Sequence, residues 1–262
     1  MDLPLGFLTV ALCLVLLCVF AIGREEKRRA LTRHVAPDAP RPFGRNTAWL
    51  AVRTPHTVSV VERLRLVDPR PANWSGGLRA LQDKTSADTA VFVSPPVEGW
   101  TFVVGLALPH PMGAAFKDKV MPLVGELGRA YPDVQYFLNY AEYDYFSWQR
   151  FRDGRFVRVF AATDEGVVSN KGMPTSEERA LGLKLFELRG VRDRHGDAGG
   201  ELLLHPTEAH VLMLAQVWSL DPTRINAGDS VDATEAGSLG YLGVAPSSWR
   251  AELADKSASH AA

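Results

Sequence analysis

The feature that most constrains this chain is an uncharged stretch of 21 residues near its N-terminus, from Leu3 to Gly23. Most of its residues are Leu, Val, Phe, Ala or Cys. A helix of that length spans ~31 Å at ~1.5 Å per residue, close to the ~30 Å hydrocarbon core of a bilayer. Because a helix satisfies its backbone hydrogen bonds internally, the pattern predicts a transmembrane anchor over residues 1–23, with the bilayer as its partner through residues 3–23.

The charges that flank this stretch predict its orientation. Only Asp2 and the amino terminus precede it, whereas five basic residues follow closely: Arg24, Lys27, Arg28, Arg29 and Arg33. Positive residues stay on the cytoplasmic side, so we expect a single-pass protein of a bacterial inner membrane with its domain in the cytoplasm. The basic run also suits anionic headgroups. A periplasmic domain remains the alternative orientation.

A cleaved signal peptide is the competing interpretation of the same stretch. The small residues Ala21 and Gly23 have the spacing of a cleavage site. Against cleavage, no Lys or Arg precedes the apolar stretch, and the stretch is longer than a usual signal-peptide core. We therefore expect the segment to remain as an anchor.

Composition divides the rest of the chain into three parts. Residues 24–45 carry seven basic and three acidic side chains and several prolines, which predicts an extended juxtamembrane linker. Residues 46–250 have the length of a single globular domain, and residues 251–262 are expected to form a disordered tail. Residues 46–262 carry a net charge of −4, which offers no footprint for nucleic acid.

Hydrophobic periodicity predicts an α+β domain with a largely antiparallel sheet and packed helices. Two strong turn signals support hairpins: Asp153-Gly154, and the prolines that follow residues 90–93. Thr175 and Glu178 have the spacing of a capping box that opens a helix. The expected strands are 46–53, 90–93, 99–106, 134–139, 143–152 and 155–163, and the expected helices are 55–67, 74–81, 116–131, 175–188 and 206–218.

The densest polar and aromatic cluster covers residues 139–145. On an extended strand, Tyr140, Glu142 and Asp144 share one face, and Tyr143 and Tyr145 share the other. Glu142 and Asp144 are thus weak candidates for an acid/base pair. The tyrosines, with the nearby Trp148, suit an interface with a partner, and a solvent-facing strand without function is the alternative.

The remaining motifs point to no chemistry. Trp100 ends a rigid proline loop and is a candidate pocket wall, with a structural turn as the alternative. No G-x-S-x-G surrounds a serine, the seven histidines show no metal-ligand spacing, and no glycine pattern matches a phosphate loop. Both cysteines, Cys13 and Cys18, lie in the apolar stretch. We expect no metal, no cofactor and no enzymatic activity.

Five segments together resemble an uncharacterised bacterial α+β domain family with no known activity. They are NTAWLAV, NWSGGL, VFVSPPVEGWTFVVG, VQYF and WSLDP, and they span about residues 46–244. The resemblance implies a bacterial source and one domain, and it transfers no functional residue.

Three functions fit these observations. The first is a membrane-anchored protein-binding module, immunity-like or envelope-associated, whose partner contacts the aromatic cluster. The second is a membrane-tethered structural scaffold. The third is a hydrolase that uses Glu142 and Asp144. The absence of a catalytic constellation favours the binding module.

Overall fold

The computed structural model describes residues 35–182, 206–225 and 238–254. The expected transmembrane segment 3–23 and the basic residues 24–33 lie outside these ranges. Within the ranges, no helix has both the length and the apolar character needed to cross a membrane. The described residues from Pro37 onward belong to one compact unit.

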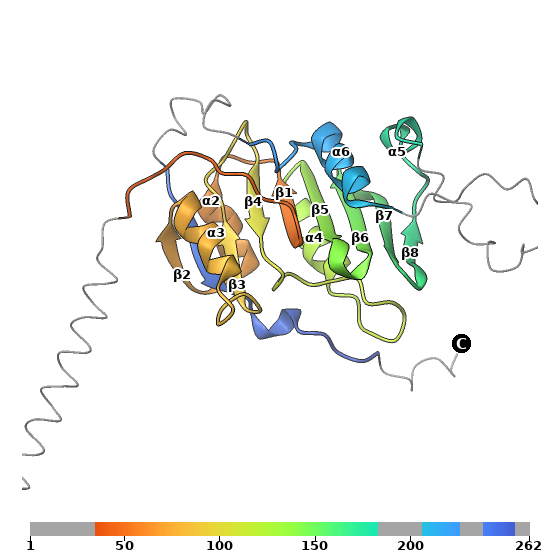
Figure 1. Ribbon diagram of the computed structural model, residues 1–262, viewed down its shortest axis with the longest axis horizontal. Helices are drawn as coiled ribbons and strands as arrows, with labels where there is room; N and C mark the ends of the chain where they lie inside the picture. Colours follow the sequence, from red (N-terminus) through yellow and green to blue (C-terminus); the bar gives the residue numbers. More distant parts are fainter. Residues whose placement is uncertain (1–34, 183–205, 226–237, 255–262) are drawn as a thin grey trace, which may run out of the picture. The chain divides into compact units, whose positions relative to one another are not determined.

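In the described part of the chain, nine strands form one sheet in which every neighbouring pair is antiparallel (Figure 1). Their spatial order is β2-β9-β3-β4-β1-β5-β6-β7-β8. The strands are β1 (Thr47–Val52), β2 (Val67–Ala72), β3 (Ala90–Val93), β4 (Thr101–Val104), β5 (Asp133–Tyr140), β6 (Tyr145–Arg152), β7 (Arg155–Thr163), β8 (Gly166–Lys171) and β9 (Gly240–Val244). The expected α+β class with a largely antiparallel sheet is therefore confirmed.

Helices cover both faces of the sheet, so the domain has three layers (Figure 1). The helices are α2 (Thr57–Leu64), α3 (Trp74–Gln82), α4 (Val120–Gly128), α5 (Ser176–Ala180) and α6 (Glu208–Trp218). Side chains of α3 and α6 join the core on one face, and those of α2 and α4 join the core on the other. Two cores explain why several strands are apolar at consecutive positions rather than at alternate ones.

The central strand β1 shows this two-sided burial most clearly. Trp49 and Ala51 point into the core under α3 and α6, whereas Leu50 and Val52 point into the core under α2 and α4. All four side chains are fully buried. Trp49 stacks on Phe137 of the neighbouring strand β5, with ring centroids 5.1 Å apart.

Three strands were not expected from the sequence. The edge strand β2 contains two prolines, which are tolerated because only β9 pairs with it. The other edge strand, β8, has weak apolar alternation. The last strand, β9, inserts between β2 and β3, a long-range pairing that local patterns do not encode. The expected helix over 116–131 begins only at Val120, which leaves Pro122 in its first turn, where proline is tolerated.

Part of the expected linker 24–45 contacts the domain. The Asp38 carboxylate accepts hydrogen bonds from the backbone N–H groups of Trp74 and Ser75, at 2.7 and 2.9 Å. It thereby adds to the capping of α3 by Asn73 and opposes the partial positive charge of that helix end. Phe43 packs on Trp49 and on Phe102, so residues 38–45 lie against the sheet face between α3 and α6.

The first residues of the expected tail 251–262 also make contacts. Leu253 forms a β-bridge with Phe116, and Glu252 pairs with Lys117 and Lys119 at 3.2 and 3.1 Å. Residues 255–262 lie outside the described ranges.

Candidate functional site

The aromatic cluster lies at the end of the sheet where β5 turns into β6, not on an extended strand. β5 ends at Tyr140, and residues Ala141–Tyr143 form one turn of 3-10 helix. Asp144 has a left-handed backbone (φ 43°), and β6 begins at Tyr145. The expectation that Tyr140, Glu142 and Asp144 share a strand face is therefore wrong, because the chain reverses direction between them.

The turn brings aromatic side chains together on an exposed surface. Tyr143 keeps 61% of its surface exposed, and its ring lies edge-on to Tyr140 with centroids 4.7 Å apart. Tyr140 pairs across the hairpin with Tyr145, and the Tyr145 ring lies 6.3 Å from that of His110. With the exposed Met112, these residues form what we call the tyrosine patch.

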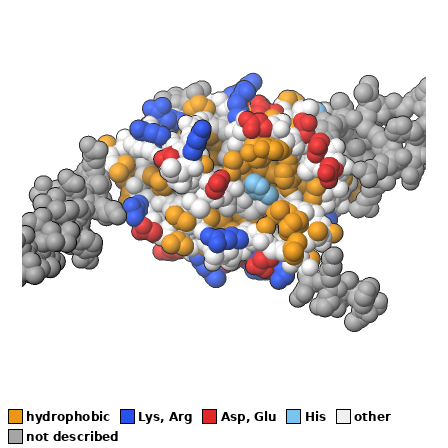
Figure 2. All heavy atoms as spheres, turned by 60° about the horizontal axis from the view of Figure 1, so that its bottom comes forward, with side chains coloured by type: hydrophobic (Ala, Val, Ile, Leu, Met, Phe, Trp, Pro, Cys, Tyr) orange, Lys and Arg blue, Asp and Glu red, His pale blue; other side chains and the backbone are white. Residues whose placement is uncertain are grey.

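Figure 2 brings this end of the molecule forward and shows hydrophobic side chains gathered around a histidine, with acidic side chains at the margin. The loop that joins β4 to α4 supplies His110 and Met112 to this surface. Two buried or half-buried tyrosines hold the loop: the Tyr136 hydroxyl donates to the Pro109 carbonyl at 2.8 Å, and the Tyr145 hydroxyl donates to the Pro111 carbonyl. Hydrogen bonds on both sides of His110 therefore hold the loop that contributes His110 and Met112 to the patch.

Carboxylates make the surroundings of the patch negative. Glu142 and Asp144 are exposed on either side of Tyr143, and neither forms an ion pair with another described residue. The pKa of Tyr140 is raised by partial burial, and further by the neighbouring Tyr143, Glu142 and Asp88. The patch therefore combines exposed π faces with unpaired negative charge.

The two tryptophans proposed as binding residues lie in the core. Trp148 is fully buried and donates its Nε1–H to Glu178 at 2.9 Å. Trp100 is 4% exposed and ends a tight turn, with the Arg53 guanidinium 5.0 Å from its ring centroid. Neither side chain offers a contact surface to a partner. For Trp100, the structure agrees with the alternative that it belongs to a structural turn and does not form a pocket wall. The membrane-proximal basic residues Arg24, Lys27, Arg28, Arg29 and Arg33 lie outside the described ranges.

Other kinds of site were sought in the same residues. Over residues 35–182, 206–225 and 238–254, no group of three or more His, Cys, Asp or Glu is placed to hold a metal ion. The sequence interpretation missed His110 and Met112, because only the fold brings their loop beside the β5–β6 turn. Comparisons with family models, with curated proteins and with solved structures found no match for this chain.

Proposed function

We propose that this chain is a membrane-tethered protein-binding module, and that its tyrosine patch binds a partner segment rich in Lys or Arg. The observation that carries the proposal is the exposed Tyr143 beside the half-buried Tyr140, flanked by the carboxylates of Glu142 and Asp144, which pair with no other described residue. Aromatic residues are enriched where proteins meet, and they contribute most of the binding free energy at such surfaces.

The side chains of the tyrosine patch favour a partner segment that is positively charged. A Lys or Arg side chain placed over a tyrosine ring gains about 0.5–1 kcal/mol at an exposed site. The carboxylates add Coulomb attraction that steers a basic segment to the surface and weakens as salt rises. Met112 and the Tyr143 ring offer apolar contact to the side chains between the basic residues. A basic amphipathic segment satisfies all three features, whereas an acidic one meets repulsion.

The two other functions have weaker support. Glu142 and Asp144 are exposed on the turn, and a hydrolase needs such a pair in a concave, desolvated site. A scaffold role requires no exposed aromatic side chain, so it leaves the exposure of Tyr143 without an explanation.

The proposal is tested with two labelled decapeptides that share their leucines and differ only in carrying Lys or Glu at the other positions. The full chain in lipid nanodiscs is titrated into each peptide, and fluorescence anisotropy reports binding. We expect the lysine peptide to bind at least tenfold more tightly, and to bind more weakly as salt increases. Tyr143→Ala and the double variant Glu142→Gln/Asp144→Asn should each weaken it at least fivefold.

Val217→Ala is the matched control, because Val217 is 58% exposed on α6, away from the patch. It should leave binding unchanged. Equal affinity for the two peptides would refute the tyrosine patch as the binding surface. So would weaker binding in Val217→Ala with unchanged binding in the Tyr143 and carboxylate variants. The basic run 24–33 of this chain is a competing occupant, and replacing its five basic residues by Gln should then tighten peptide binding.

The membrane tether is tested separately by protease treatment of intact spheroplasts that carry the chain with a C-terminal tag. The positive charges after residue 23 lead us to expect a protected tag in the membrane fraction. Digestion of the tag would place the domain outside the cytoplasm. Recovery of the tag in the soluble fraction would exclude the anchor.

A further inference from the structure

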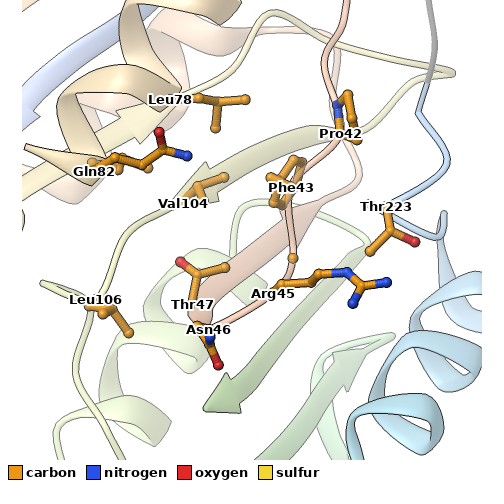
Figure 3. Close-up of a pocket in the computed structure, with 12 residues that line it drawn as sticks. Pro42, Phe43, Arg45, Asn46, Thr47, Leu78, Gln82, Val104, Leu106 and Thr223 are labelled. Carbon is orange, nitrogen blue, oxygen red and sulfur yellow. The ribbon is translucent and has the colours of Figure 1, made fainter. Parts of the chain in front are cut away.

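A groove opens beside α3 on the face of the sheet that the segment 42–47 crosses (Figure 3). Its volume is about 520 Å³, within the roughly 300–1,000 Å³ typical of small-molecule sites. The side chains of Phe43, Leu78, Leu81, Val104 and Leu106 give it an apolar floor and walls. Neither the sequence motifs nor the proposed protein interface uses this space.

Polar groups surround the apolar floor. Asn46, Thr47 and Gln82 lie on one side, and Arg45 and Thr223 lie on the other (Figure 3). The side-chain amides of Asn46 and Gln82 make no hydrogen bond to another described residue. An apolar floor with a few polar groups at its rim is the arrangement that orients an amphipathic ligand.

The lip of the groove is held rigidly in place. Gly44 has φ +102°, and a Cβ there would come within 2.6 Å of Pro222. The Phe43 N–H donates to the Pro222 carbonyl at 2.9 Å, and the Asn139 side chain donates to the Gly44 carbonyl at 2.7 Å. Asn46 also has a left-handed backbone (φ 44°). A segment held in such uncommon conformations on both sides of Arg45 keeps the groove open without a ligand, which lowers the entropic cost of binding.

The charge of the residues that line the groove limits the kind of ligand that it can bind. Arg45 is the one ionisable residue among those that line the groove. It pairs with Glu208 at 3.2 Å, and the Arg45 side chain is 73% exposed. Glu208 also accepts a hydrogen bond from Asn139 at 3.1 Å, so Arg45 can turn to a ligand without leaving Glu208 unpartnered. A guanidinium binds a carboxylate through two parallel hydrogen bonds.

We propose that this groove binds a small carboxylic acid with an apolar body, such as an aryl- or alkyl-carboxylate. The body lies on Phe43, Leu78 and Val104, and the carboxylate pairs with Arg45. The site is separate from the tyrosine patch and does not depend on the protein-binding proposal.

The probe is 4-phenylbutyrate, titrated calorimetrically into the full chain in lipid nanodiscs, with empty nanodiscs as background. We expect saturation at one molecule per chain. The uncharged 4-phenylbutanol and the cationic 4-phenylbutylamine should bind at least fivefold and at least tenfold more weakly. Leu78→Trp fills the groove with a larger side chain and should abolish binding. Arg45→Gln should weaken binding of the acid at least tenfold and leave that of the alcohol unchanged.

Arg79→Gln is the matched control, because Arg79 is exposed on the same helix but does not line the groove. It should bind the acid like the wild type. The unfolding midpoint of each variant separates loss of the groove from loss of the fold, and Arg45→Gln tests the proposal even where Leu78→Trp fails to fold. Absence of saturable binding, equal binding of acid and amine, or equal effects of Arg45→Gln and Arg79→Gln would each overturn the proposal.

Discussion

Replacing Glu178 by Gln tests how far one buried ion pair stabilises this domain. Glu178 and Arg158 are both fully buried, with the Arg158 Nε 2.8 Å from the Glu178 Oε1. The same carboxylate accepts hydrogen bonds from Trp148 Nε1 at 2.9 Å and from the Thr175 backbone N–H at 2.6 Å. It therefore joins three elements: the strands β6 and β7, and the start of α5.

The expected loss of unfolding free energy follows from the complete burial of this ion pair. Neutralising Glu178 removes the negative charge that faces the buried Arg158 guanidinium, whose other described partners are Asn170 and backbone carbonyls. Breaking one side of a buried ion pair costs about 3–5 kcal/mol. That cost is a large part of the roughly 5–15 kcal/mol that stabilises a typical domain. At a denaturant slope of about 2 kcal/mol per M urea, the unfolding midpoint should fall by about 1.5–2.5 M.

The assay is urea unfolding of the full chain in nanodiscs, followed by tryptophan fluorescence. Five of the six tryptophans are buried, so their emission should shift to the red on unfolding. Glu177→Gln is the matched control, one position away and partly exposed, and should move the midpoint by less than about 0.3 M. The double variant Arg158→Met/Glu178→Leu should recover part of the loss, because no charge then remains buried, while Trp148 and the Thr175 N–H still lose their acceptor. A midpoint shift for Glu178→Gln as small as that of its control would refute the reasoning.

Three further predictions follow from packing, capping and titration. Gly128→Ala should destabilise the domain by about 1–3 kcal/mol in the same urea assay, because its Cβ would lie 2.1 Å from the Phe151 ring. Asp38→Ala should cost about 1–2 kcal/mol, since it removes the acceptor for two N–H groups in the first turn of α3 while the Asn73 N-cap remains. Burial lowers the pKa of His110 below its ordinary 6.5, so the unfolded chain binds the proton more readily. Unfolding free energy should therefore fall as pH drops through about 6.5, and His110→Phe should show a smaller fall.

Short-range signals predicted those parts of the fold that are decided by a few neighbouring residues. Asp153 and Gly154 both adopt positive φ, at 52° and 78°, as a two-residue hairpin turn requires. Thr175 and Glu178 form the expected capping box. Yet Glu178 also pairs with Arg158 from a different strand, and no spacing along the chain encodes that second contact.

Long-range assembly explains what the sequence could not predict. The edge strand β2 contains Pro69 and Pro71, which argue against a strand until its place at the sheet edge is known. The aromatic cluster around Tyr143 was found from its composition, but its turn geometry depends on how β5 and β6 pair. The groove gathers residues from four separate parts of the chain, so none of its segments carries a motif.

The tyrosine patch and the groove lie at the same end of the sheet, and one loop serves both. Leu106 lines the groove, and His110 and Met112 belong to the patch. Two sites influence one another only through an element that has two arrangements, and this loop is fixed by the hydroxyls of Tyr136 and Tyr145. We therefore expect the affinity for 4-phenylbutyrate to stay within about twofold when the lysine peptide is bound. A change of fivefold or more would show that the loop moves, and that the patch and the groove form one regulated site.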